Sequence, residues 1–102
     1  MDIKNAIPNS VRHLIFRYRF NQEIKGSLPN SITHLMFGFC FNKNINRELP
    51  NFLTHLIFSY DFNQNISAND GIPHTVKYLK ILYLYKDTLY LHNNICVTYY
   101  AS

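Results

Sequence analysis

Apolar residues recur along this chain at a nearly fixed interval. Each recurrence is a short segment in which apolar residues stand at every second position. Leucine and phenylalanine, separated by one residue, occur in the segments 14–16, 35–37 and 56–58. Alternation with a period of two predicts a short strand with leucine and phenylalanine facing inward and the flanking residues facing outward. Because the three segments are evenly spaced along the chain, we expect one strand in every repeat unit.

The four prolines mark the same period. Pro8, Pro29, Pro50 and Pro73 recur at nearly the same step, which is slightly longer before the last of them. A fixed period between about 20 and 29 is typical of a solenoid, in which stacked coils share a core that one coil cannot form alone. The sequence therefore predicts parallel strands in a single repeat domain over residues 1–102. Its coils span residues 7–27 (coil 1), 28–48 (coil 2), 49–71 (coil 3) and 72–91 (coil 4), and residues 92–102 form a cap or an incomplete coil.

Polar residues in the repeat predict where the chain turns. The two extra residues before Pro73 fall among small and turn-forming residues at 67–71, which places the insertion in a loop. Asparagine recurs at positions 21, 42 and 63. Its short amide is suited to hydrogen bonding with backbone groups of its own and neighbouring coils, so we expect a bend there.

The C-terminal segment allows two interpretations. Residues 88–92 and 95–99 alternate on either side of Asn93 and Asn94, which predicts a capping hairpin. Alternatively, Val97 follows Val76 by one repeat step and opens a fifth, incomplete coil.

The residues at the end of each repeat resemble a known family. Phe-Asn-x-x-Ile stands at 20–24, 41–45 and 62–66, and this element is similar to the one that names the FNIP repeat, found in amoebae and in the giant viruses that infect them. The resemblance is close over residues 7–66 and weaker over 72–89. It implies a mainly β, leucine-rich-repeat-like solenoid of about four coils with parallel strands. Larger members often carry an F-box before the repeats, but only residues 1–6 precede coil 1, so we do not carry that activity over.

Composition narrows the class of protein. The chain is 47% hydrophobic and 16% charged, which is too apolar for disorder and predicts a buried core. No apolar run approaches the roughly 18 residues of a membrane-spanning helix, and the N-terminus lacks the pattern of a secretory signal. Two cysteines are too few for a disulfide framework. We therefore expect an intracellular, cytoplasmic protein with no membrane partner.

The outward positions of the strands form the candidate binding face. An apolar stripe runs beside a column of histidines, and a contiguous exposed stripe is typical of a contact surface. We expect this face to bind a protein partner, with packing on a second copy or on the chain's own tail as the competing interpretation. The predicted face consists of His13, Ile15, Arg17, His34, Met36, His55, Ile57, Tyr78 and Lys80.

The histidine column suggests two further hypotheses. Three stacked imidazoles could share a metal ion, but ligand sites need convergent geometry, so we predict neither a metal nor a cofactor. Stacked imidazoles repel one another when protonated, so the sheet is expected to loosen below their usual pKa of about 6.5.

Charge and chemistry leave two alternatives to protein binding. The net charge is +4, and Lys77, Lys80 and Lys86 lie near a cluster of C-terminal tyrosines, which is the pattern of a nucleic-acid surface. A remnant repeat fragment without selected activity is the other alternative. An enzyme is not expected, because the six acidic residues form no pair at a useful repeat position and no glycine-rich phosphate loop is present.

Overall fold

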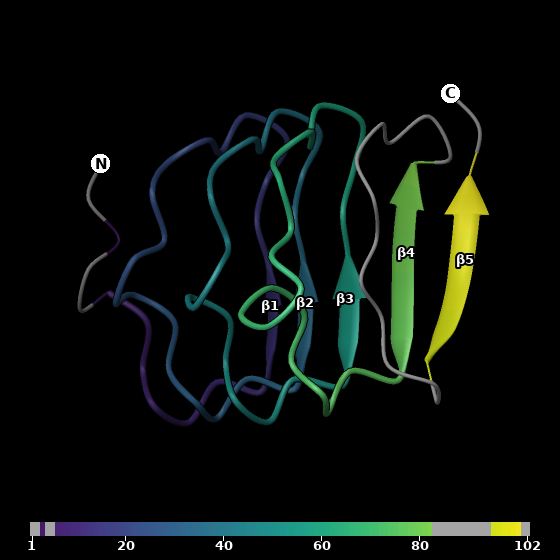
Figure 1. The fold of residues 1–102 in the computed structure, drawn as a ribbon. Helices are drawn as coiled ribbons and strands as arrows, with labels where there is room; N and C mark the ends of the chain where they lie inside the picture. The colour runs from purple at the N-terminus through teal and green to yellow at the C-terminus, as the bar shows by residue number, and fades with distance from the viewer. Residues whose placement is uncertain (1–2, 4–5, 83–94, 101–102) are drawn as a thin grey trace.

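The fold is a solenoid of parallel strands, seen in a computed structural model that describes residues 3, 6–82 and 95–100. Five strands form one sheet in chain order, and every neighbouring pair is parallel (Figure 1). The predicted fold class is confirmed. The strands are β1 (His13–Ile15), β2 (His34–Met36), β3 (His55–Ile57), β4 (Tyr78–Leu82) and β5 (Cys96–Tyr100).

The register of the sheet follows the sequence repeat. His13 pairs with His34 and His34 with His55, so β1, β2 and β3 are aligned at the repeat step. In β1, β2 and β3 the central leucine follows the histidine, and a phenylalanine follows the strand. The leucine and the phenylalanine are two residues apart, so both point into the core, as predicted. Leu35 and Phe37 have exposed fractions of 2% and 0%.

The core is built from columns of equivalent residues that stack along the solenoid. Phe37 lies between Phe16 and Phe58, with ring centroids 5.4 and 5.6 Å apart, and all three rings are nearly parallel. Within coil 2, Phe37 also stacks on Phe41 at 3.9 Å. Each fully buried side chain of this size contributes about 1.5–3 kcal/mol, so the columns supply most of the cohesion between coils.

The predicted hydrogen bonds from the asparagine column to a neighbouring coil are present. The side-chain oxygen of Asn21 accepts a hydrogen bond from the backbone N–H of Asn42 at 2.8 Å, and Asn42 accepts one from Asn63 at the same distance. Gln64 also donates to the side chain of Asn42 at 3.0 Å. Asn21 and Asn42 therefore each satisfy a backbone donor of the next coil.

The C-terminal end departs from the repeat step. β5 pairs with β4 in parallel, with Leu79 opposite Val97, so the last step is shorter than those between β1, β2 and β3. Val97 is therefore the counterpart of Leu79 and not, as the incomplete-coil interpretation predicts, of Val76, and β5 extends the parallel sheet. Three full turns, from β1 to β4, are described completely, against about four in the prediction. The remaining connection and the first strand of the predicted hairpin fall on residues 83–94, outside the described residues.

Candidate functional site

The outward side chains of the sheet form two parallel columns, as the sequence predicts. One column consists of rings. The centroids of His13 and His34 lie 4.0 Å apart, His34 and His55 are also 4.0 Å apart, and His55 and Tyr78 are 4.5 Å apart. The other column is Ile15, Met36, Ile57 and Lys80, which the register aligns across β1 to β4.

Threonines before two of the strands orient the imidazoles. Oγ1 of Thr33 lies 2.8 Å from Nδ1 of His34, and Oγ1 of Thr54 lies 2.8 Å from Nδ1 of His55. The Thr54 hydroxyl donates to the carbonyl oxygen of Thr33 at 3.0 Å. The contact between this hydroxyl and Nδ1 of His55 is one hydrogen bond, whose direction follows the tautomer of the ring.

The middle histidine is electrostatically distinct. Burial, followed by the charges of His55 and then His13, lowers the pKa of His34 below its usual 6.5. Each neighbour opposes the protonated form of this ring, because a second positive charge so close is repulsive. The stack is therefore held together best when its central imidazole is neutral.

The stacked geometry does not suit a shared metal ion. The ring planes of His13 and His34 differ by 14°, and those of His34 and His55 by 12°, so their nitrogens point in parallel directions and do not converge. Among the residues that the structure describes, no group of three histidine, cysteine or acidic residues is arranged to hold a metal.

A shallow groove runs between the two columns. Its first part has a volume of about 200 Å³, and its second part, of about 270 Å³, shares His55 and Ile57 with the first. The backbone of the central leucines forms the floor, because residues on either side of an inward residue flank it on the open face. The first part is lined by His13, Leu14, Ile15, His34, Leu35, Met36, His55 and Ile57. The second is lined by His55, Leu56, Ile57, Tyr78, Leu79, Lys80 and Thr98.

Eight of the nine predicted face residues line this groove. The exception is Arg17, which is exposed at the end of β1 but borders neither part. The apolar wall is most accessible at Ile15, which is 70% exposed, and at Met36, which is 41% exposed. Lys80 is also exposed, at the end where the wall changes from apolar to basic.

The sequence analysis missed a third surface column. Tyr18 stacks on Phe39 with centroids 5.0 Å apart, and Phe39 lies 4.9 Å from Tyr60. Tyr18 is 60% exposed. The signal was present, since an aromatic residue stands at the same distance after Pro8, Pro29 and Pro50 in turn.

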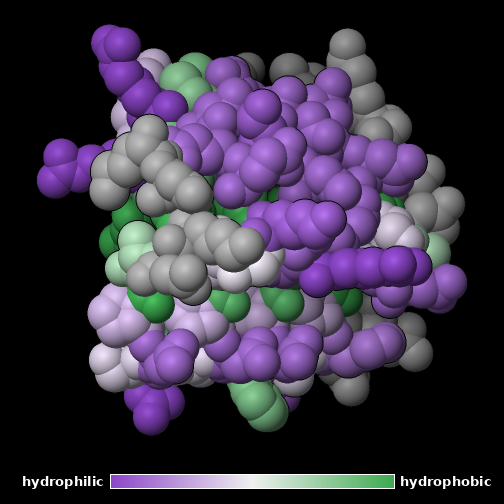
Figure 2. All heavy atoms as spheres, turned by 90° about the vertical axis from the view of Figure 1, so that its left-hand side faces the viewer, coloured by the Kyte–Doolittle hydropathy of each residue, from purple (hydrophilic) through white to green (hydrophobic). Residues whose placement is uncertain are grey.

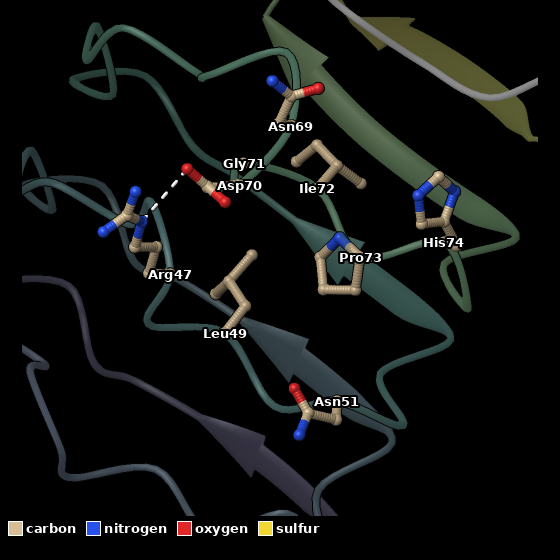
Figure 3. A pocket seen from close by; sticks show the side chains of 9 residues that line it. All are labelled: Arg47, Leu49, Asn51, Asn69, Asp70, Gly71, Ile72, Pro73 and His74. Carbon is tan, nitrogen blue, oxygen red and sulfur yellow. Dashed lines mark hydrogen bonds and ion pairs between the residues drawn. The ribbon is translucent and has the colours of Figure 1, made fainter.

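A second hollow lies at the inserted loop, away from the strand face (Figure 3). Its volume is about 170 Å³, and Arg47 and Asp70 approach each other at one side, with Nε to Oδ2 at 3.0 Å. The backbone N–H of Arg47 also donates to the carbonyl oxygen of Asp70 at 2.8 Å. Arg47 has a φ of 67°, in the left-handed region where coil 1 has Gly26. These contacts attach the inserted loop to coil 2, and an exposed ion pair of this kind adds little stability.

The side of the molecule shown in Figure 2 is more hydrophilic than the groove. Figure 2 views the molecule from the left-hand side of Figure 1, and hydrophilic side chains cover most of this surface, with a narrow row of hydrophobic ones crossing it. In the described part of the chain, no helix is long and apolar enough to cross a membrane.

The basic C-terminal cluster lies mostly outside the described residues. Lys77 and Lys80 are both exposed. Lys86 and the tyrosines at 83, 85 and 90 fall within residues 83–94, so the nucleic-acid interpretation stays a prediction.

Comparison with known proteins agrees with this geometry. The FNIP Repeat family model matches residues 3–40 and 41–83. The chain is also similar to the crystal structure of CroV588, a circular LRR protein of a giant virus, with 34% identity and a TM-score of 0.64. That alignment covers 98% of this chain and 19% of the other, so the chain spans about a fifth of its length. A search of curated protein sequences gave no match.

Proposed function

The chain belongs to the FNIP repeat family, and from that premise we propose that it is a non-enzymatic interaction module that binds a protein partner in the groove of its strand face. Leucine-rich-repeat-like solenoids are generally protein-interaction scaffolds and are non-catalytic types. The specific face, and the existence of a protein partner for this chain, are the parts that we propose.

The observation that carries the proposal is the apolar wall of the groove. Ile15, Met36 and Ile57 form a contiguous stripe held at fixed spacing by the sheet register. Scattered apolar residues on a surface are ordinary, but an ordered stripe beside a row of rings is typical of an interface. Because the stripe projects from paired strands, with Leu35 and Leu56 buried beneath β2 and β3, it presents a rigid surface with little entropy to lose on binding.

The ring column supplies the other half of the proposed interface. Stacked rings, with His34 and His55 each in contact with a threonine, offer flat, oriented side chains whose order is already fixed before a partner binds. Aromatic and polar-tipped rings at the centre of an interface contribute disproportionately to affinity. Lys80 at the far end adds a basic contact, so the groove is suited to an apolar partner segment followed by an acidic residue.

The test compares partners captured by three forms of the chain. The groove variant carries Ile15→Asp, Met36→Asp and Ile57→Asp. The control carries Asn9→Asp, Asn65→Asp and Asn69→Asp, which makes the same change in charge at exposed positions outside the groove. Both should retain the circular dichroism spectrum of the unmodified chain.

Affinity capture from the native cell, followed by mass spectrometry, gives the readout. We expect a protein that is captured by the unmodified chain and by the control but is lost from the groove variant. An identical set of proteins for all three forms would contradict binding in the groove, and an empty set for all three would favour the remnant interpretation.

A further inference from the structure

β1 leaves one edge of the sheet open within the described chain. The strand order is β1-β2-β3-β4-β5, so β1 pairs with β2 on one side and with no described strand on the other. Figure 1 shows the described residues that precede coil 1 on the side of the coils away from the strands, so these residues do not lie along β1. An open strand edge is a template for pairing with another extended chain.

The hydrogen bonds of β2 identify the groups on that open edge. The N–H of His34 donates to the carbonyl oxygen of Arg12 at 3.1 Å, and the carbonyl oxygen of Met36 accepts from the N–H of Phe16 at 2.9 Å. In a strand, successive residues direct their backbone groups to opposite sides. The counterparts of His34 and Met36 in coil 1 are His13 and Ile15, so the N–H of His13 and the carbonyl of Ile15 point to the open edge.

Coil 1 also carries three arginines, and only Arg12 has a basic counterpart in another coil, Lys77 of coil 4. Arg12, Arg17 and Arg19 are all exposed and lie close together in the sequence around β1. The next two coils have no basic residue at any of these three positions: coil 2 has Thr33, Gly38 and Cys40, and coil 3 has Thr54, Ser59 and Asp61. The charges at Arg17 and Arg19 are therefore not part of the repeat, and the set of three arginines is confined to the coil with the open edge.

We propose that the open edge of β1 binds an acidic, extended peptide segment of another protein, which adds to the sheet as a further strand. The backbone of the segment pairs with the N–H of His13 and the carbonyl of Ile15, and its carboxylates meet the arginines that flank β1. Strand addition supplies affinity through the main chain and specificity through alternate side chains. This surface adjoins the groove of the proposed function at His13 and Ile15, whose side chains line the groove, but it uses their backbone groups and goes beyond that function.

The chemistry of the edge favours a peptide over the other occupants. A nucleic acid would satisfy the arginines, but its phosphate backbone has no donor for the carbonyl of Ile15. A second copy that paired through its own β1 would bring six arginines together, and the net charge of +4 opposes self-association in general. An acidic peptide satisfies both the backbone and the charge.

The probe is a fluorescent peptide of alternating glutamate and valine, with a lysine-valine peptide and a single-stranded oligonucleotide as comparisons. The first variant is Arg12→Thr, Arg17→Ser and Arg19→Asp, which installs the residues that coil 3 carries at these positions. Its control is Lys25→Asn with Lys43→Gln. It removes two positive charges away from β1 and likewise installs residues that other coils carry at the equivalent positions. The second variant is His13→Pro, which removes the edge N–H, a change tolerated on edge strands. His13→Ala is its control, because it loses the same imidazole but keeps the N–H.

Fluorescence anisotropy should show salt-sensitive binding of the glutamate-valine peptide alone. We expect roughly tenfold or greater weakening for the arginine variant, and also for His13→Pro relative to His13→Ala. Equal binding of the lysine peptide, preferential binding of the oligonucleotide, or unchanged affinity in both variants would overturn the proposal. So would light scattering that shows a dimer dissociated by His13→Pro, since a second copy would then occupy the edge. The edge is tested with a synthetic peptide and with variants that leave Met36 and Ile57 of the groove unchanged, so either proposal can fail without the other.

Discussion

Coil 1 and coil 2 carry nearly the same inward side chains but bury them to different extents. Leu14 is half-buried, whereas Leu35, its counterpart, is 2% exposed. Val11 is half-buried where Ile32 is 0% exposed. The local strand pattern is the same in both coils, so the difference comes from stacking: coil 2 has a coil on each side, and coil 1 has one only on the β2 side among the described residues.

The comparison shows that the contribution of a repeat residue to stability depends on the coils that pack against it. In a solenoid, stability is approximately the sum of each coil's own term and the interfaces between adjacent coils. A side chain in coil 2 contributes to two interfaces, and its counterpart in coil 1 contributes to one. The same substitution made at equivalent positions of two coils therefore separates the stability that comes from the interfaces between coils from the stability of a single coil.

The largest expected difference is at the central leucines. Leu35→Ala should lower the free energy of unfolding by about 3 kcal/mol, because it opens a cavity between two coils that cannot close. Leu14→Ala should cost about 1 kcal/mol, because solvent already reaches that side chain. Urea denaturation followed by circular dichroism measures both, and Ile15→Ala, at an exposed position of the same strand, is the control for a change in β1 itself. Equal losses at the two leucines would mean that coil 1 is covered as fully as coil 2.

A smaller difference is expected along the asparagine column. Asn42→Ala removes the acceptor for the N–H of Asn63 and one of two acceptors for the side chain of Gln64, which keeps its bond to the backbone carbonyl at position 42, and should cost about 2 kcal/mol. Asn21→Ala removes the acceptor for the N–H of Asn42 alone, and should cost about 1 kcal/mol. The same denaturation experiment applies, with hydrogen exchange at the amides of Asn42 and Asn63 as a local readout. Substitution of Asn42 that leaves exchange at Asn63 unchanged would contradict the proposed chain of hydrogen bonds.

Much of the fold could be predicted from the sequence because each repeat combines apolar residues at inward positions with polar residues at outward ones. The positions of Leu35, Phe37 and Asn42 predict a strand, a core residue and a hydrogen bond to the neighbouring coil, and each is confirmed. What the sequence does not contain is the context of each coil. Leu14 and Leu35 are the same residue in the same motif, so no local pattern distinguishes an end coil from a middle one.

The candidate site was predictable in its columns but not in its contacts. Alternation places His34 and Met36 on the outer face, and the groove between their columns follows from the sheet. The pairing of Leu79 with Val97 could not be predicted, because its shorter step breaks the period on which the alignment rests. The column of Tyr18, Phe39 and Tyr60 was missed because it lies beyond the strand, where a period of two no longer assigns a face.

The smallest expected effect concerns the pH dependence of stability at His34, which lies between two imidazoles where His13 has one on the β2 side. The fold lowers the pKa of His34 below the usual 6.5, so the unfolded chain takes up this proton first as the pH falls. Stability linked to this group is therefore fully present above about pH 6.5 and is lost progressively until the pH lies below the pKa in the folded state. The melting temperature should fall between about pH 7.5 and about pH 5. In His34→Phe, which keeps a ring in the column but has no proton to gain, that fall should be smaller. If the melting temperature of the unmodified chain is the same at both pH values, the central imidazole does not carry the predicted repulsion, and coils 1 and 2 differ in packing alone.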